Sequence, residues 1–199
     1  MVLRFKIVIC NTNQLKYIMK KTFLKPILAI TVAMLLTSCM TVKPVALKGN
    51  YSDKPFEVVS DKQFDQVWSN IIDLFATKGL SIKLIDKSSG LIISEKTSFI
   101  SDYTFENSTG GLENPNASIV IEKKIVTGYN QSLKPEKITG EWNIRIKENN
   151  TGKIGVNVNL TNIDATSFIA GSQYSPAQNL MFIGKSTGKF EELITGLIK

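Results

Sequence analysis

Two stretches of this 199-residue chain alternate apolar and polar residues with a period of two. The first is Thr139–Glu148, whose large apolar residues occupy every second position, namely Trp142, Ile144 and Ile146. The second is Lys153–Thr161, and the Asn-Asn-Thr-Gly sequence between the two stretches is typical of a turn. This alternation predicts two antiparallel strands with one buried face and one solvated face.

Two other stretches repeat their apolar residues at helical spacing. Asp61–Lys78 carries one apolar stripe, and Gly79 supplies a stop signal after it. Ser60 and Gln63 match a capping box at the start of this stripe. Thr187–Ile198 carries a second stripe near the C-terminus. We therefore expect two amphipathic helices.

Further segments are rich in β-branched and aromatic residues and are predicted to be strands: Phe56–Val59, Leu80–Asp86, Leu91–Ser98 and Ala117–Thr127. Leu180–Gly184 fits either a last strand or a helical turn. Two one-sided helices and a one-sided sheet can bury each other's apolar faces. The predicted fold is therefore α+β. It has a single antiparallel sheet of about five or six strands, with two amphipathic helices, one near the domain start and one C-terminal, packed on one face.

The N-terminal region has the pattern of a signal peptide. Met19 is followed by two lysines, an apolar run extends over Pro26–Leu36, and small and polar residues lead to Cys39. A membrane-spanning helix is the alternative, but the run is shorter than the ~20 apolar residues that a bilayer requires, and no basic stop-transfer cluster follows it. We interpret residues 1–38 as a signal peptide whose translation starts at Met19.

The sequence Leu-Thr-Ser-Cys that ends this region resembles the lipobox of bacterial lipoproteins. In that family the signal is cleaved before the cysteine and the thiol is acylated, so the resemblance implies a fatty acyl group such as palmitate on Cys39. Met40, and not aspartate, follows the cysteine, which by the same resemblance implies sorting to the outer membrane with the domain facing the periplasm. Residues 39–54 are predicted to be the lipidated cysteine and a flexible tether, and residues 55–199 a single domain.

Charge and residue counts narrow the possible chemistry. The chain has 24 Lys+Arg and 17 Asp+Glu, but six of the basic residues and none of the acidic ones precede Cys39, which leaves a net charge of +1 after cleavage. This balance argues against a nucleic-acid partner. The chain has no histidine, and its two cysteines are Cys10 and Cys39, so we expect no disulfide, no metal site and no cofactor in the domain.

The order of several core and turn residues resembles the domain of NlpB/BamC-type lipoproteins. These residues are Phe64, Trp68, Gly79, the run DKSSGLI at 86–92 and the run STGKFE at 186–191. The resemblance implies a helix-grip-like domain on a lipid anchor. The best-known member of that family belongs to the outer-membrane β-barrel assembly machinery. The family supplies no catalytic residues.

Two kinds of candidate functional residue stand out. Ser186 and Lys189 fit the S-x-x-K pattern of penicillin-binding enzymes, but only ten residues follow Lys189 and the companion S-D-N and K-T-G sequences are absent, so a helix cap is expected instead. Loops rich in Gly, Asn and Ser contain aromatic residues that can contact a partner or a glycan, namely Tyr103, Phe105 and Tyr129. The alternative is that these rings fold back over the core.

Three classes of function stay open. The leading one is a non-enzymatic binding or accessory subunit of a cell-envelope complex, with an envelope protein as its partner. The second is a binding module for glycan, lipid or peptidoglycan. The third is a hydrolase that uses carboxylates or the S-x-x-K residues.

Overall fold

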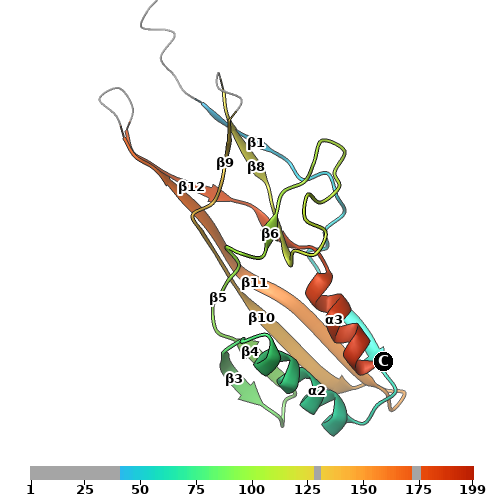
Figure 1. Ribbon diagram of the computed structural model, residues 1–199. Coiled ribbons are helices and arrows are strands. Elements are labelled where there is room, and N and C mark those ends of the chain that lie inside the picture. Colours follow the sequence, from blue (N-terminus) through green and yellow to red (C-terminus); the bar gives the residue numbers. More distant parts are fainter. Residues whose placement is uncertain (1–40, 128–130, 172–175) are drawn as a thin grey trace, which may run out of the picture. The chain divides into compact units, whose positions relative to one another are not determined.

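The computed structural model describes residues 41–127, 131–171 and 176–199 (Figure 1). Within these ranges Val42–Lys199 form one compact unit, which combines two helices with mainly antiparallel sheets, so the predicted α+β class is confirmed. The strands are β1 (Val42–Val45), β2 (Phe56–Ser60), β3 (Ile82–Asp86), β4 (Leu91–Ser94), β5 (Thr97–Ser98), β6 (Tyr103–Thr104), β7 (Ile119–Ile121), β8 (Lys123–Val126), β9 (Gln131–Leu133), β10 (Lys137–Glu148), β11 (Ile154–Ile169), β12 (Gln178–Phe182) and β13 (Gly184–Ser186).

The largest sheet has seven strands. Its order is β12-β11-β10-β4-β3, with β2 also paired to β11 and β5 paired to β10. The centre of the sheet is the hairpin of β10 and β11, in which Trp142 lies opposite Leu160 and Ile144 opposite Val158. Buried residues recur at every second position over residues 142–146 of β10 and 154–158 of β11, as the alternation predicts. The segment at Leu180–Gly184, for which two interpretations were open, lies mostly in strand β12.

The central hairpin changes register at a bulge. The pairing shifts between Thr139 and Glu141, and on the facing strand Asn162 adopts φ 53°, a left-handed conformation that is uncommon outside glycine. The Asn162 side chain donates a hydrogen bond to Glu141 Oε2 at 2.9 Å, which holds this backbone conformation. Past the bulge, β11 continues to Ile169 and pairs with β12. The sheet therefore extends beyond the part that the helices cover (Figure 1).

The prediction of a single sheet is wrong. Two three-stranded sheets, β1-β8-β9 and β13-β7-β6, accompany the main sheet (Figure 1). β6 and β7 pair in parallel. Each of the six strands in these small sheets spans only two to four residues. Strands this short show no clear period in the sequence. The predicted strand over Ala117–Thr127 is therefore two strands, β7 and β8, and the other four were not predicted as strands of further sheets.

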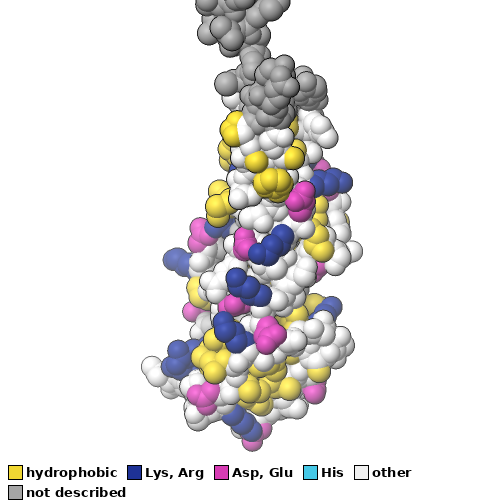
Figure 2. All heavy atoms as spheres, turned by 90° about the vertical axis from the view of Figure 1, so that its left-hand side faces the viewer, with side chains coloured by type: hydrophobic (Ala, Val, Ile, Leu, Met, Phe, Trp, Pro, Cys, Tyr) yellow, Lys and Arg dark blue, Asp and Glu magenta, His cyan; other side chains and the backbone are white. Residues whose placement is uncertain are grey.

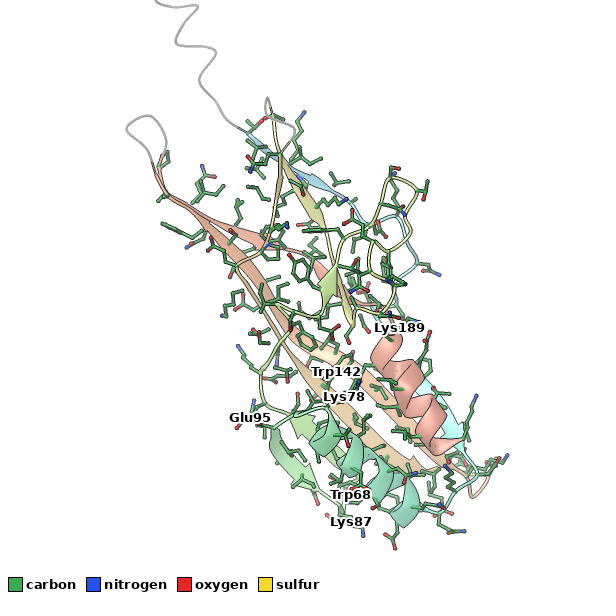
Figure 3. All side chains as sticks on the ribbon, viewed as in Figure 1. Trp68, Lys78, Lys87, Glu95, Trp142 and Lys189 are labelled. Atoms are coloured by element: carbon green, nitrogen blue, oxygen red, sulfur yellow. The ribbon has the colours of Figure 1, made fainter. Side chains whose placement is uncertain are left out.

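The helices α2 (Phe64–Thr77) and α3 (Lys189–Ile198) cover the same face of the main sheet (Figure 1). Trp142 in β10, labelled in Figure 3, stacks on Phe190 in α3, and Phe75 in α2 meets Phe190 edge on, with ring centroids 6.3 Å apart. These three rings join the sheet and both helices in one hydrophobic core. Within the described ranges, no helix is long and apolar enough to cross a membrane.

The start of α2 differs from the predicted capping box. The N-cap residue is Gln63, and it makes no side-chain cap hydrogen bond. Ser60 is instead the buried last residue of β2. Its Oγ atom accepts a hydrogen bond from the N–H of Lys62 at 3.1 Å, and its hydroxyl donates to the main-chain oxygen of Ile198. Because this hydroxyl joins β2 to the end of α3, it does not reach the first turn of α2.

Residues 42–54 belong to the folded unit, which corrects the prediction of a flexible tether. β1 pairs with β8 along its whole length, from Val42 opposite Val126 to Val45 opposite Lys123. The Pro and Gly residues of the stretch are typical of linkers, but a partner strand so distant in the sequence leaves no local signal. The chain is therefore ordered from the start of β1.

Glu106 holds the chain that follows β1. Its carboxylate accepts hydrogen bonds from the main-chain N–H groups of Lys48 and Gly49 at 2.7 and 2.8 Å, and from the hydroxyl of Tyr51 at 2.8 Å. Burial acts to raise the pKa of Glu106, but these donors outweigh it and bring the pKa below its usual range. Burial and the bond to Glu106 raise the pKa of Tyr51 to about 12.

Candidate functional site

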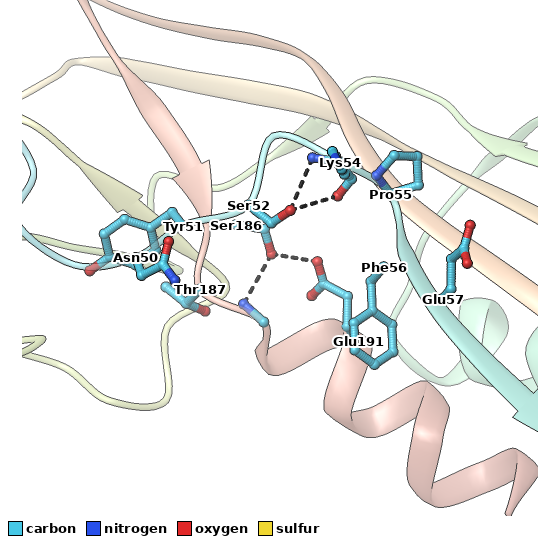
Figure 4. A pocket seen from close by; sticks show the side chains of 11 residues that line it. Asn50, Tyr51, Ser52, Lys54, Pro55, Phe56, Glu57, Ser186, Thr187 and Glu191 are labelled. Atoms are coloured by element: carbon cyan, nitrogen blue, oxygen red, sulfur yellow. Dashed lines mark hydrogen bonds between the residues drawn. The ribbon is translucent and has the colours of Figure 1, made fainter.

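A pocket of about 680 Å³ opens where α3 begins (Figure 4). One wall is residues 50–57, which lead into β2 and include its first two residues, and the other is the turn from β13 into the first turn of α3. An ion pair between Lys185 and Asp53 joins the two walls. The pocket therefore depends on the ordered segment after β1.

A hydrogen-bonded pair, the half-buried Ser186 and the buried Glu191, lines this pocket. Ser186 donates its hydroxyl hydrogen to Oε1 of Glu191 at 2.7 Å, and its Oγ atom accepts the N–H of Gly188 at 3.1 Å (Figure 4). Glu191 is only 5% exposed, and its Oε2 atom has no hydrogen-bond partner in the described part of the chain. Burial raises the pKa of Glu191, and the hydrogen bond from Ser186 opposes this effect without cancelling it.

The sequence Ser-Thr-Gly-Lys at 186–189 forms the turn that positions this pair. Gly188 is the N-cap of α3 and adopts φ 90°, a conformation that glycine tolerates at no steric cost. Thr187 donates its hydroxyl to the main-chain oxygen of Ala117 at 2.5 Å, which fixes the turn to the loop before β7. Glu191 then falls in the first turn of α3, where the helix dipole favours a carboxylate.

The serine and lysine of the S-x-x-K pattern do not act as a pair in this fold. Lys189 donates its Nζ hydrogen to Glu192 Oε2 at 2.8 Å, whereas the Ser186 hydroxyl is donated to Glu191. Ser186 is also not the cap of the helix, because α3 has Gly188 at its N-cap and begins at Lys189. The geometry therefore gives Ser186 a buried carboxyl group, and not an amine, as its partner.

The pocket presents a mixed set of groups to a ligand. Asn50, Lys54 and Glu57 line it, and their side chains have no hydrogen-bond or ion-pair partner among the described residues. Phe56 is 40% exposed and adds an aromatic surface. An aromatic ring beside amide, ammonium and carboxylate groups can bind a polar organic molecule such as a sugar or a short peptide.

Two of the predicted loop aromatics, Tyr103 and Phe105, lie outside this pocket. Tyr103 and Phe105 meet edge to face, with ring centroids 5.5 Å apart, and Lys123 Nζ lies 5.8 Å from the centroid of Phe105. Phe105 is buried in the core, while Tyr103 is half-buried and lines a separate hollow of about 350 Å³. Tyr129 and Cys39 lie outside the described residues, so their expected roles stay predictions.

Sequence reasoning missed two parts of the pocket. Residues 50–54 were assigned to a tether, although Tyr51 is an aromatic residue in a polar stretch. Glu191 was the second part that was missed. The signal was present, since Glu191 stands three residues before Ile194 and seven before Ile198, on the buried face of α3.

Within the described ranges, no group of three or more Asp, Glu, Cys or His side chains could hold a metal ion. No protein-family model matches this chain, and a search of curated proteins gives no match. Function is therefore inferred from the chain's own residues and geometry.

Proposed function

We propose that this chain is a lipoprotein of the bacterial cell envelope, anchored in the outer membrane through Cys39. The Val42–Lys199 unit faces the periplasm and acts as a non-enzymatic binding or accessory subunit of an envelope complex. The signal-like stretch that ends in Leu-Thr-Ser-Cys supports the anchor. The likeness to NlpB/BamC-type lipoproteins supports the same assignment at the level of fold and anchor.

The observation that favours a protein partner is the free edge of the main sheet at β3. Among the described strands only β4 pairs with β3, so the other side of Ile82–Asp86 presents unpaired main-chain groups. Leu84 and Ile85 on this strand are 43% and 52% exposed. Proteins normally cover or charge such edges, because an uncovered edge pairs with other chains. A partner that adds an extended strand would supply both the missing hydrogen bonds and the apolar cover.

The charged residues of β3 do not protect this edge. The Nζ atom of Lys83 lies 3.5 Å from Oε1 of Glu141, over the face of the sheet. Asp86 accepts hydrogen bonds from the N–H and the hydroxyl of Ser88 in the following turn, at 3.0 and 2.6 Å. Figure 2 shows the side of the unit that carries β3, where hydrophobic side chains gather at both ends and charged side chains lie between them.

Photo-crosslinking in intact cells tests this proposal. A photoreactive amino acid replaces Ile85 on the free edge, and the matched control carries it at Thr151, an exposed residue of the turn between β10 and β11. The proposal predicts a discrete protein adduct from position 85 that is absent from position 151. Absence of an adduct at 85, or the same adducts from both positions, would contradict edge binding.

A second candidate function is the binding of a glycan or peptidoglycan fragment in the pocket at the start of α3. The observation that favours it is the set of unpaired Asn50, Lys54 and Glu57 side chains beside the exposed ring of Phe56. Sugars commonly stack on aromatic rings while such polar groups bind their hydroxyls.

Co-sedimentation with purified peptidoglycan distinguishes this candidate from the first. Phe56→Ala should abolish binding, whereas Phe168→Ala, which removes a similarly exposed ring far from the pocket, should leave it intact. If the unaltered protein does not sediment with peptidoglycan, or if both variants bind equally, the pocket is not a peptidoglycan site.

A further inference from the structure

One end of the Val42–Lys199 unit must lie close to the proposed lipid anchor. β1 begins at Val42, three residues after Cys39. An extended chain spans at most about 3.6 Å per residue, so the Cα atoms of Cys39 and Val42 can be no more than about 11 Å apart. Because β1 is paired with β8, this limit applies to the folded unit and not to a loose tether. A lipid on Cys39 would therefore hold this end at the membrane surface.

The anchor end consists of the start of β1, the facing ends of β8 and β9, and the paired ends of β11 and β12. Val42 lies opposite Val126, and Val126 lies opposite Gln131. Glu136, which follows β9, donates its N–H to the main-chain oxygen of Thr166 at 2.9 Å and so joins this hairpin to β11. Figure 1 shows these strand ends together at one end of the unit, with β3 and α2 at the other.

The anchor end carries an exposed apolar patch. Thr166 pairs with Met181 and Phe168 pairs with Asn179, so Phe168 and Met181 project from the same face of the β11–β12 hairpin as diagonal neighbours. Phe168 is 54% exposed and Met181 is 73% exposed. Lys43 in β1 is also exposed at this end. We call the two apolar residues the Phe168–Met181 patch.

We infer that the Phe168–Met181 patch lies in the interfacial layer of the bilayer that holds the Cys39 lipid. Apolar side chains gain free energy by entering the boundary between head groups and acyl chains, and a basic residue such as Lys43 is attracted to anionic head groups. The short link to Cys39 makes the membrane the surface nearest to the patch. This inference rests on the proposed lipidation, and it directs the free edge at β3 away from the membrane.

Lipid-specific quenching tests the inference on the full-length lipoprotein. The acylated Cys39 thiol is blocked and Cys10 is removed with the signal, so a fluorophore can be placed on one introduced cysteine. Met181→Cys reports on the patch, and Ile85→Cys, at the opposite end of the unit, is the matched control. Both positions are more than half exposed, so both variants are expected to fold. The protein is reconstituted in phosphatidylethanolamine and phosphatidylglycerol vesicles with brominated acyl chains.

We expect the bromines to remove about half or more of the fluorescence at position 181, because interfacial residues reach roughly 5–10 Å into the boundary layer, and to leave position 85 unchanged. Equal quenching at both positions, or none at 181, overturns the inference if mass spectrometry has verified the lipid on Cys39. A photo-crosslink in cells from position 181 to a protein, without lipid quenching, also overturns it. If Cys39 carries no lipid, the proposed anchor fails first and this inference fails with it.

Discussion

The ring of Phe190 in α3 lies against the indole of Trp142 in β10, with 4.1 Å between ring centroids and 21° between the ring planes. Phe75 approaches Phe190 edge on, and Phe99 approaches Trp142 edge on with 6.2 Å between centroids. This aromatic cluster connects the main sheet to both helices. It also fixes α3, and with it Glu191, at the wall of the pocket.

Phe190→Ala is expected to lower the free energy of unfolding by about 3–5 kcal/mol, because it removes a buried ring and leaves a cavity between the sheet and α3. Urea denaturation followed by circular dichroism measures the change. Leu193→Ala is the control on the same helix, since Leu193 is 44% exposed, and it should cost less than about 1 kcal/mol. Similar losses in the two variants would show that α3 does not pack through Phe190.

The pH dependence of the stability of Glu106→Gln tests whether Glu106 holds the segment after β1. The donors around Glu106 keep its pKa below the usual range although burial acts to raise it. The unfolded state therefore takes up the proton first as the pH falls, and the stability due to ionised Glu106 is present near neutral pH and lost through the acid range. We expect the unaltered protein to be more stable than Glu106→Gln at about pH 7, with a smaller difference at about pH 3.

The pKa of Tyr51 is an independent measure of the hydrogen bond between Tyr51 and Glu106. Tyr51 has its pKa raised to about 12 by burial and by the bond to Glu106, so Glu106→Gln should lower this pKa. A Tyr51→Phe variant identifies which step of the spectrophotometric titration belongs to Tyr51. A Tyr51 pKa that is the same with Glu and Gln at position 106 would contradict the hydrogen bond.

Glu191→Gln should increase stability at neutral pH. Burial raises the pKa of Glu191, so the folded state holds its proton to higher pH than the unfolded state, and stability falls as the pH rises through this interval. Glutamine keeps an oxygen for the Ser186 hydroxyl and carries no charge. Thermal unfolding should show a higher midpoint for Glu191→Gln at about pH 7 and nearly equal midpoints at about pH 4, below the ordinary pKa of a glutamate. A variant that is less stable at both pH values would contradict the raised pKa.

The sequence predicted the structure best where a periodic pattern extended over many residues and one face of the element is buried. The alternation of Trp142, Ile144 and Ile146 predicted the buried face of β10, and the apolar stripes predicted both helices with ends within three residues of those observed. These features depend on local periodicity, which one chain displays in full. The resulting α+β class was correct.

The rest of the fold depends on contacts between distant residues. β1 forms a strand because it pairs with β8, with Val42 opposite Val126. Ser60 does not cap α2, because its hydroxyl donates to the main-chain oxygen of Ile198. The pocket likewise forms only when residues 50–57 meet the start of α3. No period or spacing along the chain encodes such pairings, so the small sheets and the pocket could not be predicted.

The central claim is that Cys39 carries the lipid that anchors this chain to the outer membrane. Mass spectrometry of the mature protein from membranes, with Cys39→Ser as the control, tests it most directly. We expect an N-terminal peptide that begins at Cys39 and carries fatty acyl groups, and a Cys39→Ser protein that keeps its signal and takes up no fatty-acid probe. A mature peptide that spans Ser38 and an unmodified Cys39 would contradict both cleavage before Cys39 and its lipidation.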